Sequence, residues 1–383
     1  MRKIVFTHSI NSIVNKFTSL FLGIYFLKIT NGNIPIVIMF YLVKYSFNIP
    51  LSFIISKIIN KNNVLNIYRL GLLSNGLCLM ILLFLGEGIT NYILIFAMID
   101  SFTSTLYWSP YKMILYNFQK DNELKNIFSS NSMVTSIISI ISILGMGYII
   151  TNLSYSIVFI IIFILSIIAV IVTFQFEPCK FKIQKFKLKN LKYVLKDKKA
   201  KEIYKLAFWE GTGHRGGLDT AITILLFLMV GTEFSLGQYN ALFALLGLIT
   251  AYIVKKYMNI KNSKKTFFIA SILILISTIP IIFTTSFSLF ILYNIIFNIA
   301  YKITQISVDS VIFKINDNEV MSKYKIEYTF LHENTHAMGK VLSELILLIV
   351  TIHWFNYQNY QIVAALLSFS VLIQALIYRK LKI

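Results

Sequence analysis

The stretch that decides the fold is EPCKFKIQKFKLKNLKYVLKDKKAKEIYK, residues 177–205. It holds eleven lysines against Glu177, Asp197 and Glu202, and no apolar period continues through it. It can therefore enter neither a protein core nor a bilayer. Six long runs rich in Ile, Leu and Phe lie on each side of it, and about 20 mostly apolar residues suffice to span a bilayer as a helix. The sequence thus predicts two six-helix halves joined by a basic linker.

The prediction is an all-α membrane protein with twelve transmembrane helices. The expected spans are 8–28, 34–58, 64–85, 89–117, 124–151 and 154–176 in the first half, and 204–229, 235–255, 265–284, 286–313, 324–352 and 360–379 in the second. This divides the chain into an N-terminal half (1–176), a basic cytoplasmic linker (177–203) and a C-terminal half (204–383).

The composition supports a membrane protein. Of the 383 residues, 57% are hydrophobic and 14% are charged, which is too apolar for an ordinary soluble chain. A net charge of +20 would suggest a nucleic-acid partner if the cations formed one soluble patch, but they lie in short loops between apolar runs. Cys78 and Cys179 imply no disulfide framework. The N-terminal run lacks a small-residue cleavage site, so we expect a retained first helix.

The loops fall into two alternating classes. Lys and Arg gather near 57–69, 112–125, 177–205, 255–265, 314–325 and the C-terminal end, whereas the loops near 29–33, 86–91, 152–155, 230–235, 284–287 and 353–359 carry none. Because cytoplasmic loops retain the Lys/Arg excess, we predict a multi-pass protein of the bacterial inner membrane. Both termini and the linker are expected in the cytoplasm.

A weak internal repeat relates the two halves. SKIINK (56–61) follows the second span, and AYIVKK (251–256) follows the eighth, at the same place in its half. At these loops the chain resembles the major facilitator superfamily, whose six-helix halves repeat about an axis along the membrane normal. The family's loop pattern is Gly-x-x-x-Asp-Arg-x-Gly-Arg/Lys. The first loop here offers Ser56, Asn60, Lys61 and Asn63, without the glycine or the aspartate.

Two longer stretches resemble a poorly characterised branch of bacterial major facilitator proteins. One runs from YWSP (107–110) through Phe128 and Asn131. The other is KYKIEY (323–328) with the residues after it, where the branch has Glu-Tyr, then Arg-Glu, then Gly-Arg. In this chain His332 replaces the first arginine and Lys340 the second. The resemblance implies a transporter and leaves its substrate unassigned.

Several expected spans carry polar side chains at helical spacing. A charge at the bilayer centre costs about 2.5–3.5 kcal/mol even on lenient scales, so such residues usually face a cavity or a partner. In the fold that the resemblance implies, spans one, four, seven and ten line the central cavity. Span one carries His8, Asn11, Asn15 and Lys16; span four Asp100, Trp108 and Tyr111; span seven Glu210, His214, Arg215 and Asp219; and span ten Asn298, Lys302, Gln305 and Asp309.

In span seven, Glu210/His214 and Arg215/Asp219 are i,i+4 pairs, so each residue is expected to meet its partner on one helix face. Glycines between them would allow a kink or a close backbone approach. A static ion network and a functional site are both open, and we favour the site. We expect Arg215 and Asp219 to share one cavity with Lys302 and Asp309 of span ten. Lys16 is expected either to face the cavity or to snorkel, whereas Lys28 and Lys112 are expected as plain interface anchors.

The eleventh span contains HENTH, residues 332–336, which matches H-E-x-x-H. On a helix this motif presents two imidazoles to a zinc ion, with the glutamate as general base. Intramembrane proteases with this motif take an aspartate from further along the chain as the third ligand, and no aspartate follows His336. We therefore expect no metal site. Instead we assign Glu333, His336, Lys340 and Glu344 to a face that lines a cavity or a gate.

The resulting hypothesis is a secondary active transporter that moves a small or amphipathic solute by alternating access, without a cofactor or catalysis and as a monomer. No G-x-x-x-x-G-K-[ST] loop is present, so a proton or ion gradient is expected to drive it. The expected proton carriers are Asp100, Glu210, Asp219, Asp309 and Glu333. Arg215, Lys302 and Lys340 would anchor an anionic group, and Trp108 and Tyr111 would stack on the substrate. A lipid or amphiphile flippase, a transport-dead scaffold and a zinc protease remain as alternatives.

Overall fold

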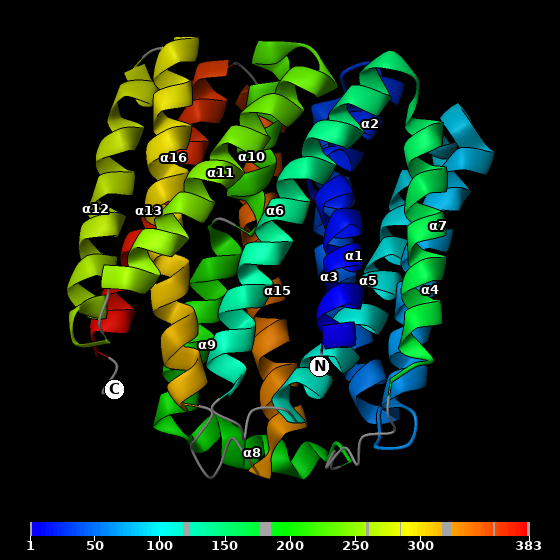
Figure 1. Ribbon diagram of the computed structural model, residues 1–383. Coiled ribbons are helices and arrows are strands. Elements are labelled where there is room, and N and C mark those ends of the chain that lie inside the picture. The colour runs from blue at the N-terminus through cyan, green and yellow to red at the C-terminus, as the bar shows by residue number, and fades with distance from the viewer. Residues whose placement is uncertain are drawn as a thin grey trace. The chain divides into compact units, whose positions relative to one another are not determined.

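The computed structural model is helical, and its described residues include no strand (Figure 1). It describes residues 2–117, 123–176, 185–213, 215–257, 260–283, 285–315, 323–354 and 357–380. The chain forms two compact units. Unit 1 contains Met1–Lys187 and Val230–Ala241, and unit 2 contains Leu188–Met229 and Leu242–Ile383. Each unit is described by itself below.

Unit 1 contains the helices of the first six expected spans. These are α1 (Arg2–Leu20), α2 (Leu22–Ile29), α3 (Ile34–Ile58), α4 (Val64–Leu85), the 3-10 helix η1 (Gly86–Tyr92), α5 (Ile93–Asn117), α6 (Glu123–Asn152) and α7 (Tyr155–Thr173). The first span is interrupted at Phe21, between α1 and α2. Helix α3 begins after Asn33, whose side chain accepts a hydrogen bond from the Ile36 N–H and so caps the helix. Helix α1 packs on α6 and α7, while α3 and α4 both pack on α5.

Unit 2 contains the remaining helices. These are α8 (Leu188–Lys196), α9 (Lys198–Thr212), α10 (Gly217–Val230), α11 (Glu233–Tyr257), α12 (Ile260–Phe283), α13 (Phe287–Ile315), α15 (Lys325–Trp354) and α16 (Tyr357–Lys380), with α11 beginning in unit 1. Helix α8 and the first turns of α9 lie within the residues predicted as linker. Val194, Ala200 and Ile203 of this stretch are fully buried, so the prediction that it enters no protein core is wrong: its apolar side chains pack inward while its lysines stay outside. The seventh span is two helices, α9 and α10, with a break between Thr212 and Gly217. Helix α9 packs on α15 and α16, and α12 packs on α13 and α16.

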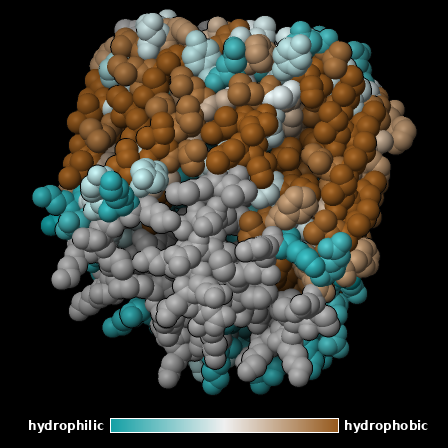
Figure 2. Space-filling model, viewed as in Figure 1, coloured by the Kyte–Doolittle hydropathy of each residue, from teal (hydrophilic) through white to brown (hydrophobic). Residues whose placement is uncertain are grey.

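The long helices carry apolar side chains outward. Among the described residues, nine helical stretches are long and apolar enough to cross a membrane, one of which (Val64–Ile114) includes both α4 and α5. Figure 2 shows hydrophobic side chains along the sides of the long helices and hydrophilic ones toward their ends. Leu77, Ile141 and Ile276 are examples of exposed apolar side chains on three of these helices. This is the surface expected of helices that face lipid.

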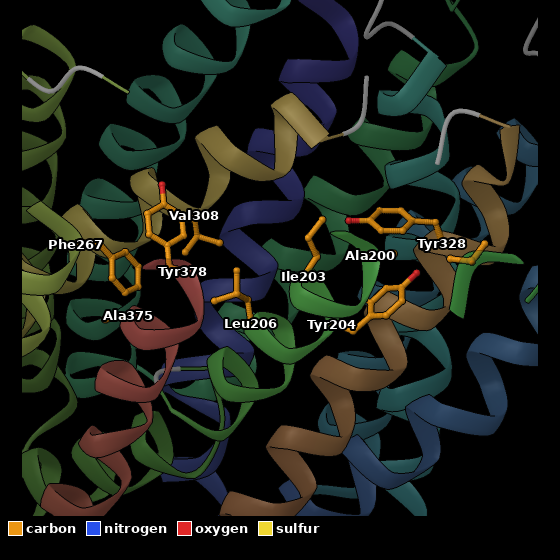
Figure 3. Packing of buried hydrophobic residues seen from close by; sticks show 10 residues of the cluster. Ala200, Ile203, Tyr204, Leu206, Phe267, Val308, Tyr328, Ala375 and Tyr378 are labelled. Carbon is orange, nitrogen blue, oxygen red and sulfur yellow. The ribbon is translucent and has the colours of Figure 1, made fainter. Parts of the chain in front are cut away.

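One end of unit 2 is held by a buried apolar cluster, shown in Figure 3. Its rings and aliphatic side chains come from α8, α9, α12, α13, α15 and α16: Val194, Ala200, Ile203, Tyr204, Leu206, Phe267, Val308, Tyr328, Ala375 and Tyr378. The ring of Phe267 stacks on that of Tyr378 at 4.9 Å between centroids. The Tyr378 hydroxyl donates to the Ser307 carbonyl at 2.8 Å. The cluster therefore fixes the first part of α9 against α15. The charges of the seventh span follow from Glu210 onward.

Candidate functional site

Lys44 and Asp100 form a buried ion pair in unit 1. The Lys44 Nζ of α3 lies 2.6 Å from the Asp100 Oδ2 of α5, and the two side chains are only 13% and 8% exposed. One turn further along α3, the Asn48 Oδ1 accepts hydrogen bonds from the Ser101 and Thr105 hydroxyls, both at 2.9 Å. An unpaired charge in the bilayer is costly. The pair and its polar neighbours keep two charges inside the membrane-spanning part of this unit.

Lys44 was not predicted as a site residue, although the sequence contained the signal. It lies well inside the expected span 34–58, and a lysine there needs a partner. The sequence pointed to Asp100 alone. The pairing joins α3 to α5, helices that also pack closely elsewhere along their length.

An aromatic cluster adjoins α1 in the same unit. His8 Nδ1 and the Tyr107 hydroxyl are hydrogen bonded at 2.7 Å. The His8 ring also stacks on Tyr111, with 4.3 Å between centroids, and meets Trp108 edge-on at 5.9 Å. Tyr107 and Tyr111 are buried, whereas His8 and Trp108 are half-buried. The structure thus brings the predicted Trp108 and Tyr111 together with His8, and the Trp108 ring stays partly accessible for stacking on a ligand.

Helix α9 approaches α15 so closely that side chains are excluded between them. A Cβ added to Gly211 would clash with the His336 carbonyl oxygen, and one added to Gly339 would clash with the Phe208 carbonyl oxygen. Glycine is required at both positions for this reason, as at other close helix contacts in membranes. The predicted close backbone approach of the seventh span is therefore made to the eleventh.

The seventh span is not the single helix from which the i,i+4 pairing of Arg215 and Asp219 was predicted. The span is not one continuous helix, because α9 ends at Thr212 and α10 begins at Gly217, so helical spacing does not apply across the break. Arg215 instead pairs with Glu210 across the break, with 3.0 Å between its Nε and the Glu210 Oε1. The Arg215 side chain is 46% exposed and that of Glu210 is 19% exposed. His214 lies outside the described residues.

The predicted face of α15 lies against this broken span. The Ser343 hydroxyl accepts a hydrogen bond from the Gly217 N–H at 2.8 Å, and the Glu344 Oε1 accepts one from the Thr220 hydroxyl at 2.7 Å. One turn before Ser343, the backbone at Lys340 contacts Gly211 and Gly216. Residues of the eleventh span thus hold both sides of the break, which the sequence did not predict.

The tenth span shows local hydrogen bonds along α13. The Lys302 Nζ donates to the Gln305 Oε1 at 3.2 Å, and the Asn298 amide donates to the Asn294 carbonyl at 2.8 Å. The Asp309 side chain lies outside the described side chains. A cavity shared by Arg215, Asp219, Lys302 and Asp309 stays a prediction.

The H-E-x-x-H segment lies within α15. His332 Nδ1 and the Glu333 Oε1 are 3.4 Å apart. In the described part of the chain, no group of three or more His, Cys, Asp or Glu side chains is arranged to hold a metal ion. No third ligand to His332 and His336 is thus found among these residues.

A further buried charge lies where the seventh span leads into α11. The Glu233 carboxylate, 2% exposed as a residue, pairs with Lys28 of α2 and accepts a hydrogen bond from the Tyr155 hydroxyl at 2.8 Å. The Phe234 N–H donates to the Thr151 hydroxyl of α6 at 2.9 Å. Lys28, predicted as a plain interface anchor, thus also pairs with a buried carboxylate. Together these contacts dock the first turn of α11 on α2, α6 and α7 within unit 1.

Comparison with known proteins identifies the family. The model of the Major Facilitator Superfamily matches residues 4–323, and comparison with curated proteins gives no match. Among solved structures, the chain is similar to an outward-facing bacterial homologue of the iron transporter ferroportin, with a TM-score of 0.72, 12% identity and coverage of 99% of this chain and 98% of that chain. It is also similar to the nucleoside transporter NupG, with a TM-score of 0.70, 13% identity and coverage of 99% of each chain.

The E. coli fucose:proton symporter FucP gives a TM-score of 0.63 at 12% identity, over 98% of this chain and 96% of that chain. Identities this low show a shared fold and nothing finer. The family match covers most of the chain and agrees with the all-helical, multi-pass architecture. The chain belongs to the major facilitator superfamily.

Proposed function

We propose that the protein is a secondary active transporter that moves a small solute across the bacterial inner membrane by alternating access, driven by a proton or ion gradient. The family and its fold are those of transporters rather than enzymes. The observation that carries the proposal is the buried Lys44–Asp100 pair. A protein with apolar residues of similar volume in place of such a buried pair is commonly as stable or more stable. Because stability alone does not require these two charges, we infer a transport role in which a proton, an ion or a charged substrate group replaces one partner of the pair.

The substrate class follows from the neighbouring side chains. Trp108 and His8 are half-buried and offer ring surface, and the Lys112 Nζ lies 5.9 Å from the centre of the Trp108 ring. Rings that stack, together with the Lys112 cation, which can bind an anionic group, favour a small aromatic or amphipathic solute with an acidic group.

Gradient coupling has support from one relative. One of the solved structures similar to this chain is a fucose:proton symporter. The carboxylates that we propose as proton carriers are Asp100, Glu210, Asp219, Asp309 and Glu333. The predicted orientation, with both termini and the linker in the cytoplasm, forms part of the proposal. It rests on the alternation of basic and non-basic loops.

The experiment begins with the purified full chain. Small aromatic and amphipathic acids are screened for ligand-dependent thermal stabilisation, because a ligand that binds only the folded state raises the melting temperature. Each solute that binds is then measured for flux into proteoliposomes with and without an imposed pH gradient or ion gradient. We expect gradient-driven accumulation in the wild type and its loss in Asp100→Asn.

The matched control is Glu202→Gln, which changes a partly exposed glutamate paired with Lys205 on α9. This variant is expected to transport like the wild type. Solutes that bind but never cross the membrane under any gradient would refute active transport. Normal accumulation in Asp100→Asn would exclude the Lys44–Asp100 pair from coupling.

A further inference from the structure

Glu344 is a fully buried carboxyl group beside the break in the seventh span. Its residue exposure is 0%. Its Oε1 accepts a hydrogen bond from the Thr220 hydroxyl at 2.7 Å. Its Oε2 is buried and has no hydrogen-bond partner among the described residues. A carboxylate accepts hydrogen bonds at both oxygens, so this site suits a neutral carboxyl group better than an ionised one.

Glu344 and the residue before it hold the start of α10. Thr220 is in the first turn of that helix, directly after the break. The Ser343 hydroxyl accepts from the Gly217 N–H, and a Cβ on Gly217 would lie 2.6 Å from the Ser343 carbonyl oxygen. The backbones are therefore in contact at this point. A change in the charge of Glu344 acts directly on the half of the seventh span that follows the break.

Among the described residues, the charged and titratable groups that act on Glu344 come from three helices. Lys340 lies one turn earlier on α15, Asp219 belongs to α10, and Tyr360 belongs to α16. Lys340 favours an ionised Glu344 and Asp219 disfavours it, so their electrostatic effects on Glu344 oppose each other. Within the described residues no cation lies within ion-pair distance of Glu344, and the donor to its Oε1 is the neutral Thr220 hydroxyl. An ionised carboxylate would thus be buried without a direct counter-ion, which costs several kcal/mol.

We propose that Glu344 carries the coupled proton of this transporter and that its ionisation displaces α10. This rests on the proposed function, and it adds a residue on the eleventh span to the proton carriers predicted from sequence. In the neutral form the proton resides on Oε2, while Oε1 accepts from Thr220 and fixes the first turn of α10. Loss of the proton to water leaves a carboxylate that one hydroxyl cannot solvate. Water must then enter the break, or the first turn of α10 must move.

The first test needs no substrate. Infrared spectra of the purified full chain in lipid nanodiscs are recorded through a pH titration, and the carbonyl band of protonated carboxyl groups is followed. We expect a band that is absent in Glu344→Gln and shifted in frequency in Thr220→Val, which removes the hydrogen-bond donor. Glu202→Gln, the partly exposed control, is expected to keep this band. Identical bands in the wild type and Glu344→Gln at every pH would overturn the proposal.

The second test measures coupling. The side-chain amide oxygen that Glu344→Gln introduces can still accept from Thr220, so the variant imitates the neutral form and should fold. It should exchange a solute found in the flux screen across the membrane, yet it should not accumulate that solute under a pH gradient. Accumulation at the wild-type level would refute the role of Glu344. If the wild type itself shows no gradient-driven flux, the proposed function fails, while the infrared result still reports on Glu344.

Discussion

The buried pair of Lys44 and Asp100 gives the sharpest test of the energetics. Two unit charges 2.6 Å apart attract by roughly 6 kcal/mol at an effective dielectric constant of about 20, and desolvation of both groups opposes this gain. Removing one partner leaves the other charge buried, so Lys44→Met and Asp100→Asn should each lower the free energy of unfolding by about 3–5 kcal/mol. The double variant leaves no unpaired charge. It should be less destabilised than either single variant.

The chain contains a matched control for this cycle. Lys205 and Glu202 are also 2.6 Å apart, but their side chains are 58% and 28% exposed. Solvent screens such a pair, and i,i+3 or i,i+4 pairs on a helix surface contribute about 0.3–0.5 kcal/mol. The two pairs therefore share a distance and differ in burial. Their comparison isolates the effect of the buried environment.

The assay is a double-mutant cycle for each pair, measured as unfolding of the purified protein in mild detergent. For Lys44 and Asp100 we expect a coupling energy of at least about 2 kcal/mol, within the range found for residues in contact. For the exposed pair we expect less than about 1 kcal/mol. Additivity of the two buried single changes to within about 0.5 kcal/mol would show that these charges do not stabilise each other, and the reasoning from burial would fail.

Three further predictions concern packing, docking and orientation. Gly211→Ala should destabilise the fold by about 1–3 kcal/mol or more because its Cβ would meet backbone, whereas Gly247→Ala, with open space at its Cβ, should be neutral or stabilising in the same thermal melts. Glu233→Gln should increase hydrogen exchange in the first turns of α11, since it removes the carboxylate that pairs with α2; unchanged exchange would contradict this docking. In cells that carry a cysteine-free background, an impermeant thiol reagent should label a cysteine at the exposed Glu87 and not one at Lys189, and the reverse pattern would invert the topology. Glu87 serves as the outer reporter because its side chain is exposed.

The membrane-spanning helices could be predicted closely because their signal is local. Apolar runs bounded by polar turns placed the expected spans 34–58 and 64–85 on α3 and α4. Breaks within a span were harder to foresee. The glycines of the seventh span allowed a kink there, but the span was predicted as one helix. Nothing in the run around Phe21 marks the end of α1 at Leu20. Side-chain chemistry marks a break only when glycine or proline causes it.

The partners of buried charges could not be predicted from spacing along the chain. Arg215 pairs with Glu210 across the broken turn, because a break replaces the i,i+4 geometry of a helix with a loop. Lys44 and Asp100 are far apart in sequence and meet only because α3 packs on α5. A single sequence shows that a membrane-embedded charge needs a partner. It does not show which helix supplies that partner.

The close packing of the seventh span on the eleventh could have been predicted from small residues, but the sequence analysis gave weight to charged residues instead. Gly339 and Ser343 stand four residues apart on α15, which is the small-x-x-x-small spacing that lets two membrane helices touch backbone to backbone. Across the contact, Gly211 meets the backbone of His336 and Lys340, and Gly217 meets that of Ser343. Charges drew attention to the tenth span, but small residues decide which helices approach most closely. Because no side chain separates α15 from the break, the residue next to Ser343 reaches the first turn of α10 directly, and that residue is Glu344.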